Sequence, residues 1–441
     1  MASNFWVRRL FGYGLLLPSL IAVECWNAAA ATPPTPDDQI LVPSRSTAFS
    51  AAVDEIVNTQ ILSLNIPSVT VAVMKDGVIV HQGAYGLERV APDAVTTVST
   101  PYLLDSLTKQ FTAAAIMILV QQGKLKLDQP IKTYVPYAPK TWDKVTLRHL
   151  LTHTSGLPHD PKWGYPSIEQ QASNPDDVLK HHVFNQPLKS DPGEKYAYSN
   201  TGYAALGAIV EKVSRQTYPV FLEDNIFKPL GMKNTVIHWE NASLRKAARG
   251  YLYDSGKKQW SPDYEEDQPL AAGGLQSTVV DLAKWDAALR TNQILTAASK
   301  KEMWTSFVLS DKTPSGYGFG WAVSKLSNKQ NVIWHSGGGW GFDTAFFRFL
   351  DAGLTVVVLT NLQFETDGPD HAVQMAQSIA TAYDPALNMD SGSAAGFTMQ
   401  SEKPGNTTSL KPTENKSSVA AIFENLDKKQ NTQQPQTAAA N

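Results

Sequence analysis

Ser106-Leu107-Thr108-Lys109 opens an unbroken amphipathic run and decides how this chain is expected to fold and react. Residues three apart on a helix share one face, so Lys109 is predicted to lie beside the Ser106 hydroxyl. A serine hydroxyl is a poor nucleophile at neutral pH, but a neighbouring lysine can take its proton if burial keeps that lysine partly neutral. The structural alternative is a serine that caps the helix, followed one turn later by a solvated lysine.

A second stretch, Tyr196-Ala197-Tyr198-Ser199-Asn200, lies between the turn residues Asp191-Pro192-Gly193 and an apolar helical stretch over 201–213. Tyr198 and Asn200 are two residues apart, so in an extended segment they point to the same side. A phenol there can relay protons, and an amide can hydrogen-bond both a lysine and a substrate carbonyl. Alternatively, Tyr198 is a core aromatic and Asn200 caps the next helix.

A third stretch, His335-Ser336-Gly337-Gly338-Gly339-Trp340-Gly341, follows a strand-like run over 331–334. Glycines at the end of a strand let backbone approach a ligand closely and can aim an N–H at a developing oxyanion. Trp340 is expected either to wall an acyl pocket or to stand as a surface aromatic at a turn. The alternative for the whole stretch is a glycine-rich turn between two strands, with His335 at the sheet edge.

In this order, the three motifs Ser-x-x-Lys, Tyr-x-Asn and His-x-Gly resemble those of the serine hydrolases of the penicillin-binding-protein and class C β-lactamase-like family. The resemblance covers about residues 46–385 and is specific for fold and reaction type rather than for substrate. Four accessory stretches fit the family as well: Leu150-Leu151-Thr152-His153-Thr154-Ser155-Gly156-Leu157, Ala272-Gly273-Gly274-Leu275-Gln276-Ser277, Tyr317-Gly318-Phe319-Gly320-Trp321 and Val357-Val358-Leu359-Thr360-Asn361.

The resemblance implies two-step acyl transfer on an ester, an amide or a D-amino-acid peptide, with cell-wall peptides and β-lactams as particular cases. Ser106 is then the nucleophile, and Lys109 and Tyr198 share its proton. Asn200 would position Lys109 and the acyl amide. His153 lies beside a serine in His-Thr-Ser-Gly, but the resemblance places this stretch in a structural loop.

The third motif is implied to complete the site. The backbone N–H groups of the nucleophile and of Gly338 form the oxyanion hole, and His335 polarises the site or touches the substrate. Ser336, Gly337 and Trp340 are expected to contact the substrate.

His335 departs from the best-known members, since penicillin-binding proteins and true β-lactamases usually carry lysine at this place. Histidine is a weaker, pH-dependent cation. If His335 acts when charged, binding of a carboxylate-bearing substrate is expected to weaken as the pH rises through about 6.5. A neutral His335 instead favours esters, amides or D-amino-acid peptides, and family members with His-x-Gly include esterases and D-stereospecific peptidases.

The alternative function is a catalytically silent protein that holds a peptide or cell-wall fragment in the expected cleft between the sheet and the helical region. The presence of Ser106, Lys109, Tyr198 and Asn200 together counts against it, because a chain that performs no chemistry has no physical need for all four.

The composition suits a folded, exported enzyme. A hydrophobic content of 42% and a charged content of 18% allow a large core, and the formal net charge of -3 gives no basic stripe for nucleic acid. Neither a His-Glu-x-x-His spacing nor a Gly-rich phosphate loop after a strand appears, so no metal or cofactor is expected. Cys25 is the only cysteine, which leaves the mature chain without an internal disulfide.

The N-terminus predicts export. Arg8 and Arg9 precede an apolar stretch over 10–23 and an alanine tract over 28–31, so residues 1–31 read as a signal peptide. The stretch is too short for a membrane anchor, so stable membrane insertion of the mature chain is not expected. Lipidation of Cys25 is disfavoured by the preceding Glu24. The expected location is the periplasm or the medium.

The pattern along the chain predicts an α+β fold, an α/β sandwich whose antiparallel sheet is flanked by N- and C-terminal helices and carries a large, mostly helical insertion. A Pro-rich linker is expected over 32–45, the folded domain over 46–385 and a disordered polar tail over 386–441. The sheet is expected from 46–100 and 310–385, and the helical region from 101–309. The predicted elements are a helix over 47–64, a hairpin over 68–87 around Asp76-Gly77, strands over 317–323, 331–334, 343–349 and 355–360, and a helix over 371–382.

Overall fold

The computed structural model describes residues 47–90, 93–160, 171, 174–237, 247–254, 259–262, 270–364 and 370–389. The predicted signal peptide and linker lie outside these residues, as does the predicted polar tail beyond residue 389. A 3-10 turn, η8 (Pro385–Leu387), ends the described chain, and Leu387 is fully buried. The packed domain therefore continues past the predicted boundary at residue 385.

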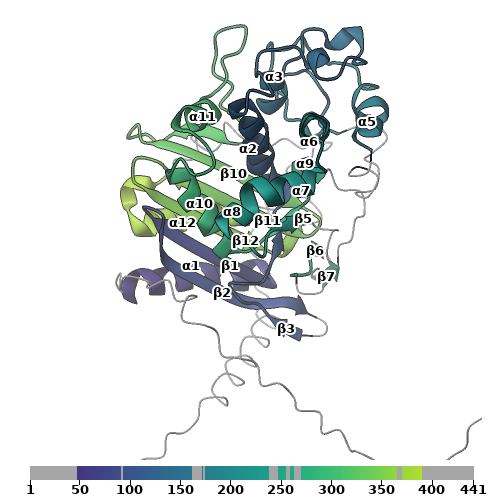
Figure 1. Ribbon diagram of the computed structural model, residues 1–441. Coiled ribbons are helices and arrows are strands. Elements are labelled where there is room, and N and C mark those ends of the chain that lie inside the picture. The colour runs from purple at the N-terminus through teal and green to yellow at the C-terminus, as the bar shows by residue number, and fades with distance from the viewer. Residues whose placement is uncertain are drawn as a thin grey trace, which may run out of the picture. The chain divides into compact units, whose positions relative to one another are not determined.

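A seven-stranded antiparallel sheet forms the centre of the domain (Figure 1), with the strand order β3-β2-β1-β12-β11-β10-β9. Its strands are β1 (Ser68–Lys75), β2 (Val78–Val90), β3 (Asp93–Val95), β9 (Ala322–Lys325), β10 (Asn331–Gly339), β11 (Phe342–Phe349) and β12 (Leu354–Thr360). β1 pairs with β12 from Val69↔Thr360 to Lys75↔Leu354. This confirms the prediction of a sheet completed by segments from both ends of the chain.

The β1–β2 hairpin turns at Asp76 and Gly77, as predicted. The φ angles of these residues are 53° and 83°. A two-residue hairpin turn of type I′ requires positive φ at both positions, which Asp and Gly tolerate better than other residues.

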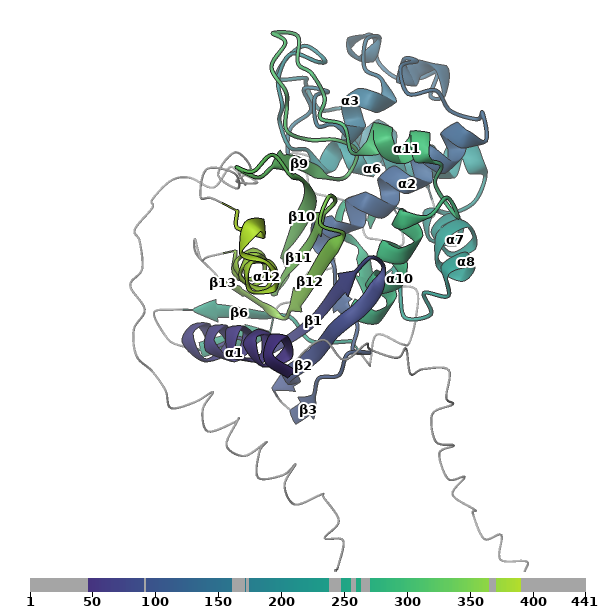
Figure 2. The same ribbon diagram turned by 90° about the vertical axis from the view of Figure 1, so that its left-hand side faces the viewer.

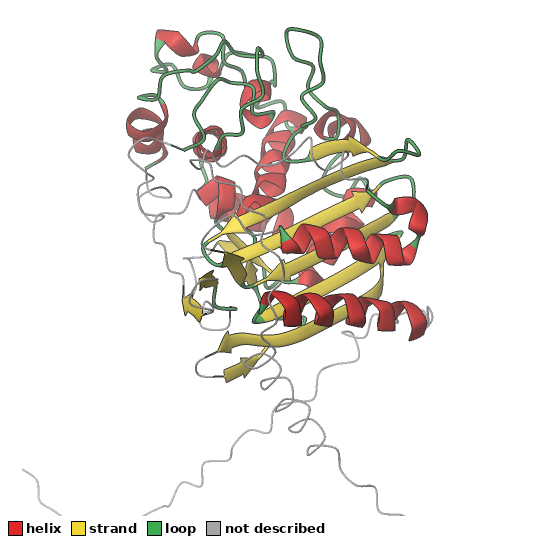
Figure 3. Ribbon diagram, turned by 180° about the vertical axis from the view of Figure 1, so that it is seen from behind, coloured by secondary structure: helices red, strands yellow, loops and turns green. Residues whose placement is uncertain are grey.

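Helices cover both faces of the sheet. α1 (Thr47–Leu64) and α12 (His371–Tyr383) lie on one face (Figure 3), while α2 (Thr108–Gln121) and α10 (Val279–Arg290) lie on the other (Figure 2). Side chains of successive residues of β12 point to opposite faces of the sheet. Val356 and Val358 pack into the core with α1 and α12, whereas Val357 and Leu359 pack into the core with α2 and α10. The sandwich predicted from the sequence is therefore the observed fold.

The region between the two parts of the sheet is mostly helical, as predicted. Besides α2 and α10 its helices are α3 (Leu147–Leu151), α5 (Pro175–Asp177), α6 (Asn200–Ser214), α7 (Tyr218–Leu222), α8 (Lys228–Leu230), α9 (Leu270–Gly273) and α11 (Ala297–Met303). Shorter turns are η2 (Asp105–Leu107), η3 (Ile131–Thr133) and η4 (Lys140–Trp142), with π-helical turns at η5 (Val178–Val183) and η6 (Glu223–Phe227).

The sequence pattern did not predict two small sheets. One contains β4 (Tyr102–Leu103), β8 (Leu275–Ser277) and β5 (Val236–Ile237), and the other β13 (Leu362–Phe364), β6 (Tyr251–Asp254) and β7 (Gln259–Pro262). Strands this short carry too few residues for alternation to be recognised.

Two predicted strand boundaries were wrong. β9 starts only at Ala322, because the chain bends over 319–321 and Tyr317 forms only an isolated bridge to Ala322. β10 does not end at Trp334 but continues through the glycines, since its ladder with β11 runs on to Gly339↔Phe342.

None of the helices within the described residues combines the length and the apolar composition needed to cross a bilayer. Among the same residues, no group of three or more His, Cys, Asp or Glu side chains is arranged to hold a metal ion.

Candidate active site

Ser106 lies in the 3-10 turn η2, which leads without a break into α2. Asp105, just before the serine, is buried and has a φ of 47°, a region that residues other than glycine rarely occupy. In the described chain no side-chain hydrogen bond caps the start of η2 or of α2. Ser106 is therefore not a helix cap, and its partly exposed hydroxyl is available for chemistry.

Two side chains meet at the Ser106 hydroxyl. Lys109 Nζ lies 2.9 Å from Ser106 Oγ, and the Tyr198 hydroxyl donates to the same Oγ at 2.9 Å. Lys109 is fully buried, and its Nζ also donates to the Ala272 carbonyl oxygen at 2.8 Å. In this arrangement the serine proton can pass to the lysine, directly or through the phenol.

Burial sets the protonation of both neighbours. The pKa of Lys109 falls from 10.5 to about 7, because desolvation outweighs the opposing fields of Asp160 and Asp105. Lys109 can therefore lose its proton near neutral pH. Burial also holds the pKa of Tyr198 well above 10, although its hydrogen bond to Ser106 lowers it. Lys109 is thus the group that changes its protonation near neutral pH.

Among the described residues the Asn200 side chain makes no hydrogen bond to Lys109, although the sequence predicted one. Ser199 caps α6, since its Oγ accepts the N–H of Gly202 at 3.1 Å, and Asn200 is the first residue of the helix. The two-residue alternation of an extended segment no longer holds there. The Asn200 amide nitrogen donates to Asp160 Oδ1 at 3.0 Å. Within the described residues, Asn200 Oδ1 is a buried acceptor without a donor.

His335 is fully buried and neutral. Its Nδ1 donates to the Ser336 carbonyl oxygen at 2.6 Å, and its Nε2 accepts from the Tyr317 hydroxyl at 2.7 Å. Burial, with a smaller effect of the nearby Lys109, lowers the pKa of His335 from 6.5 to about 3. Of the two alternatives for His335, its burial therefore favours the neutral one.

β10 packs closely against the nucleophile turn. A Cβ at Gly337 would lie 2.3 Å from the Leu104 carbonyl oxygen and 2.6 Å from Thr344 Oγ1, so only glycine permits this approach. The direct role of Gly337 in the structure is therefore packing, although the sequence placed it among the substrate contacts.

The outer edge of β10 is open at the third motif. β9 pairs with β10 only from Asn331 to Trp334, so residues 336–339 have no strand on that side among the described residues. A Cβ at Gly338 would meet nothing within 4 Å. An open strand edge of this kind can bind an extended peptide through its backbone. Ser336 and Gly338 therefore lie where backbone contacts to a substrate are possible.

Trp340 occupies the β10–β11 turn with a φ of 47°. A Cβ at Gly273 would lie 3.7 Å from Trp340 Cζ3 and 3.9 Å from the Asp105 backbone. The indole thus lies against Gly273 at the end of α9, and the Asp105 backbone of the nucleophile turn approaches the same glycine. This position favours the prediction that Trp340 walls the acyl pocket over the prediction of a surface aromatic at a turn.

Gly337→Ala is expected to destabilise the protein. The added methyl group overlaps Leu104 and Thr344 and must push β10 away from the nucleophile turn, which costs about 1–3 kcal/mol in the free energy of unfolding. Gly338→Ala is the matched control, since its methyl group enters open space and the thermal midpoint should stay that of the wild type. Thermal unfolding followed by circular dichroism measures both variants, and equal midpoints would contradict the close approach.

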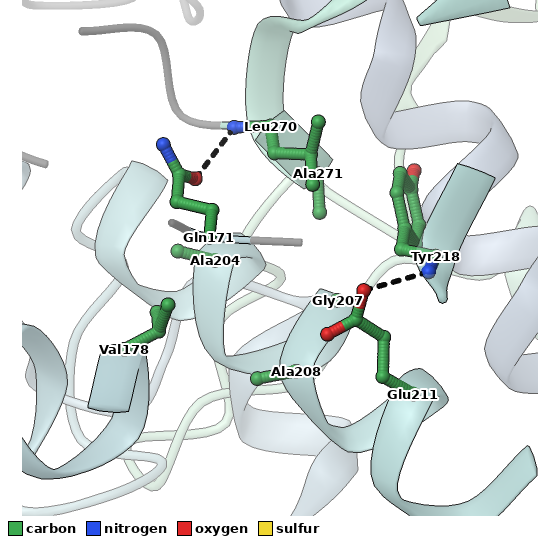
Figure 4. Close-up of a pocket in the computed structure, with 9 residues that line it drawn as sticks. All are labelled: Gln171, Val178, Ala204, Gly207, Ala208, Glu211, Tyr218, Leu270 and Ala271. Carbon is green, nitrogen blue, oxygen red and sulfur yellow. Dashed lines mark hydrogen bonds between the residues drawn. The ribbon is translucent and has the colours of Figure 1, made fainter. Parts of the chain in front are cut away.

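A small pocket lies apart from these residues, between α6, α7 and α9 (Figure 4). Glu211 Oε1 accepts the Tyr218 N–H at 2.7 Å, and Gln171 Oε1 accepts the Leu270 N–H at 3.0 Å. Burial raises the pKa of Glu211 to about 8. The cavity of about 10 Å³ has room for about one water molecule, and Ser106 does not line it. The pocket is therefore not the substrate site.

Three residues at the site were not singled out from the sequence. Ala272 and Tyr317 lie in accessory stretches of the resemblance, which could have pointed to them. Asp160, whose charge acts on Lys109, lies in no motif, and only the fold brings it to the site.

Comparison of sequences gives the relatives of this chain. The Beta-lactamase family model matches residues 49–379. The chain is 29% identical over 324 residues to a penicillin-binding protein of Bacillus subtilis (strain 168), covering 70% of this chain and 71% of that protein. It is 27% identical over 324 residues to Protein flp of Staphylococcus aureus (strain MW2), covering 71% of this chain and 63% of that protein. The match therefore spans less than two thirds of Protein flp.

Solved structures show the same fold. The octameric penicillin-binding protein homologue from Pyrococcus abyssi has a TM-score of 0.64 and 27% identity, covering 77% of this chain and 78% of that chain. The D-amino acid amidase from Ochrobactrum anthropi SV3 has a TM-score of 0.64 and 23% identity, covering 77% of this chain and 99% of that chain. At this identity the similarity establishes a shared fold and nothing about the activity of this chain. By the extent of the family match, this chain belongs to the Beta-lactamase family of serine hydrolases.

Proposed function

We propose that this protein is an exported serine hydrolase that cleaves an ester, an amide or a D-amino-acid peptide through an acyl-enzyme on Ser106. The observation that carries the proposal is the position of Lys109 Nζ and the Tyr198 hydroxyl, each 2.9 Å from Ser106 Oγ. A buried lysine that loses its proton near pH 7 can activate the serine, and a packing role requires no such pair.

The proposed reaction has two steps. Ser106 Oγ attacks the substrate carbonyl carbon, and its proton passes to neutral Lys109, directly or through Tyr198. The backbone N–H groups of Ser106 and Gly338 stabilise the oxyanion. The bond to the leaving group then breaks, and the leaving group takes up the proton. Water attacks the acyl carbon by the same proton route, which releases the acid and restores the serine.

The charges at the site support a substrate without an obligatory carboxylate. His335, with a pKa of about 3, supplies no positive charge at neutral pH. Asp160 adds a negative charge beside Asn200. Esters and amides therefore rank before β-lactams as substrates.

A substrate panel tests the proposal. The purified mature protein and Ser106→Ala are assayed with a short-chain p-nitrophenyl ester, a D-amino acid amide and a chromogenic cephalosporin. The amide is included because a protein of the same fold is a D-amino acid amidase. We expect serine-dependent turnover of the ester or the amide and slower turnover of the cephalosporin. Absence of turnover and of any acyl adduct in the intact mass would favour the silent binding protein instead.

The pH dependence of ester hydrolysis tests Lys109 as the base. Lys109 must lose its proton before it accepts that of Ser106, so kcat/KM should rise with pH and reach half its plateau near a pH of about 7. Asp160→Asn removes a negative charge that raises the pKa of Lys109, so its profile should shift to lower pH. Rates between about pH 5 and 9, corrected for spontaneous hydrolysis, measure both profiles.

Asp93→Asn is the matched control for the charge. Asp93 lies on β3, the edge strand at the opposite end of the sheet from β9. The pH profile of kcat/KM for Asp93→Asn should coincide with that of the wild type. A profile of Asp160→Asn that stays in place or moves to higher pH would refute the assigned effect of this carboxylate.

Export is part of the proposal and rests on the N-terminal sequence. Arg8 and Arg9, the apolar stretch over 10–23 and the alanine tract over 28–31 support a cleaved signal peptide and a periplasmic or secreted product. N-terminal sequencing of protein recovered from periplasm and medium tests this. A product that keeps Met1 and remains in the cytoplasm would contradict export.

A further inference from the structure

His153 is tied to the backbone on both sides of Tyr198. It lies just after α3, fully buried, with a φ of 57°. The Ala197 N–H donates to the His153 carbonyl oxygen at 2.8 Å, and the Ser199 N–H donates to His153 Nδ1 at 3.0 Å. These are the two residues that flank Tyr198 in the chain. One buried residue thus fixes the backbone from which the phenol projects.

The His153 ring also supports the phenol directly. Its centroid lies 4.2 Å from that of the Tyr198 ring, with an interplanar angle of 34°. Tyr317 and Tyr203 lie against the same imidazole at 4.6 Å and 5.0 Å. The imidazole is therefore held in a cage of aromatic rings and cannot turn without moving them. Tyr198 lies on this support and reaches Ser106 Oγ at 2.9 Å.

We propose that His153 is a positioning residue for the proposed acyl transfer: its imidazole and its backbone carbonyl hold Tyr198 so that the phenol stays within hydrogen-bond distance of Ser106. The inference rests on the proposed function and adds to it a residue that touches neither the serine nor the substrate. It acts on the reaction through its contacts with Tyr198 and with the backbone on either side of it.

The hydrogen bond from the Ser199 N–H requires one protonation state and one tautomer of the His153 imidazole. Nδ1 accepts from the Ser199 N–H, so in the neutral ring the proton is on Nε2. Protonation of Nδ1 would abolish the acceptor. Burial and, after it, the charge of Lys109 hold the pKa of His153 well below 6.5, against the smaller effect of the Ser199 hydrogen bond. The neutral form therefore persists at the pH at which the enzyme would work.

Two substitutions separate the contributions of the ring and of the acceptor. His153→Phe keeps a ring beside Tyr198 but removes the Nδ1 acceptor. His153→Asn places an amide oxygen near the former Nδ1 position and tolerates positive φ, but removes the ring. A displacement of a reacting group by about 1 Å can cost about a hundredfold in rate. We expect each variant to lower kcat for a p-nitrophenyl ester about ten- to a hundredfold with little change in KM.

The decisive measurement repeats both substitutions in a Tyr198→Phe background. If His153 acts through the phenol, the second substitution should lower kcat by less than about threefold there, because the group that it positions is already gone. The same fold loss in both backgrounds would overturn the proposal, because a general weakening of the domain acts whether or not the hydroxyl is present.

The outcome for His153 is distinct from the outcome for the proposed function. Wild-type activity that is unaffected by Ser106→Ala would refute the proposed function. Serine-dependent activity together with equal losses in both backgrounds would refute only the role of His153.

A measurement on the wild-type protein tests the proposal even if the His153 variants fail to fold. The His153 imidazole, assigned by nuclear Overhauser contacts to the rings of Tyr198 and Tyr317, should remain the Nε2–H tautomer between about pH 5 and 9. Titration of His153 within this range, or the Nδ1–H tautomer, would overturn the proposal, because either removes the acceptor for Ser199.

Discussion

Ser106→Ala is expected to lower kcat/KM for a p-nitrophenyl ester by about a thousandfold or more. A methyl side chain cannot form an acyl-enzyme, and Lys109 and Tyr198 then have no hydroxyl to deprotonate at 2.9 Å. Steady-state rates measure the loss. The intact mass of protein quenched during turnover gives a second readout, since the wild type should gain one acyl group and the variant none.

Ser63→Ala provides the matched serine control. Ser63 lies exposed on α1 and donates to the Gln60 carbonyl oxygen. The wild-type rate should be retained. If Ser106→Ala also retained that rate, Ser106 would not be the nucleophile, and the proposed acyl transfer through Ser106 would be refuted.

The long elements of the fold were predictable because each carries several repeats of its pattern. The helices predicted over 47–64 and 371–382 are α1, with 18 residues, and α12, with 13 residues. The Asp76-Gly77 turn was predictable because its backbone conformation restricts the residue types. The small sheet of β4, β8 and β5 was not, since its short strands are defined only by partners from distant parts of the chain.

At the site, sequence reasoning reached the groups that are close along the chain or belong to a motif. Ser106 and Lys109 lie one turn apart, so their contact is local, and Tyr198 was recognised by its motif. Asp160 was not, because it meets Asn200 only through the loop packing. The neutrality of His335 follows from its burial beside Lys109, which a three-residue motif does not encode.

Lys109→Met is expected to abolish ester hydrolysis as fully as Ser106→Ala while leaving the protein folded. Methionine matches the length and the buried position of the lysine but cannot accept the proton of Ser106. A loss of about a thousandfold or more in kcat/KM is expected. Lys124→Met is the control, because Lys124 is exposed in the turn after α2 and should be dispensable. Substantial residual hydrolysis by Lys109→Met would assign the base to Tyr198 alone.

The same variant is expected to stabilise the fold in a pH-dependent way. The pKa of Lys109 falls from 10.5 in the unfolded chain to about 7 in the folded protein, so the unfolded state binds the proton more tightly. The wild type therefore gains stability as the pH rises from 7 towards 10.5, and below pH 7 it carries the full cost of about 5 kcal/mol. Met avoids this cost but leaves the Ala272 carbonyl oxygen without its donor, a loss of about 1–3 kcal/mol. Urea unfolding should thus show a gain for Lys109→Met at about pH 6 that shrinks by about pH 9. A gain of the same size at both pH values, or a loss at the lower one, would mean that the lysine is not held in a neutral-favouring site and could not serve as the base proposed for it.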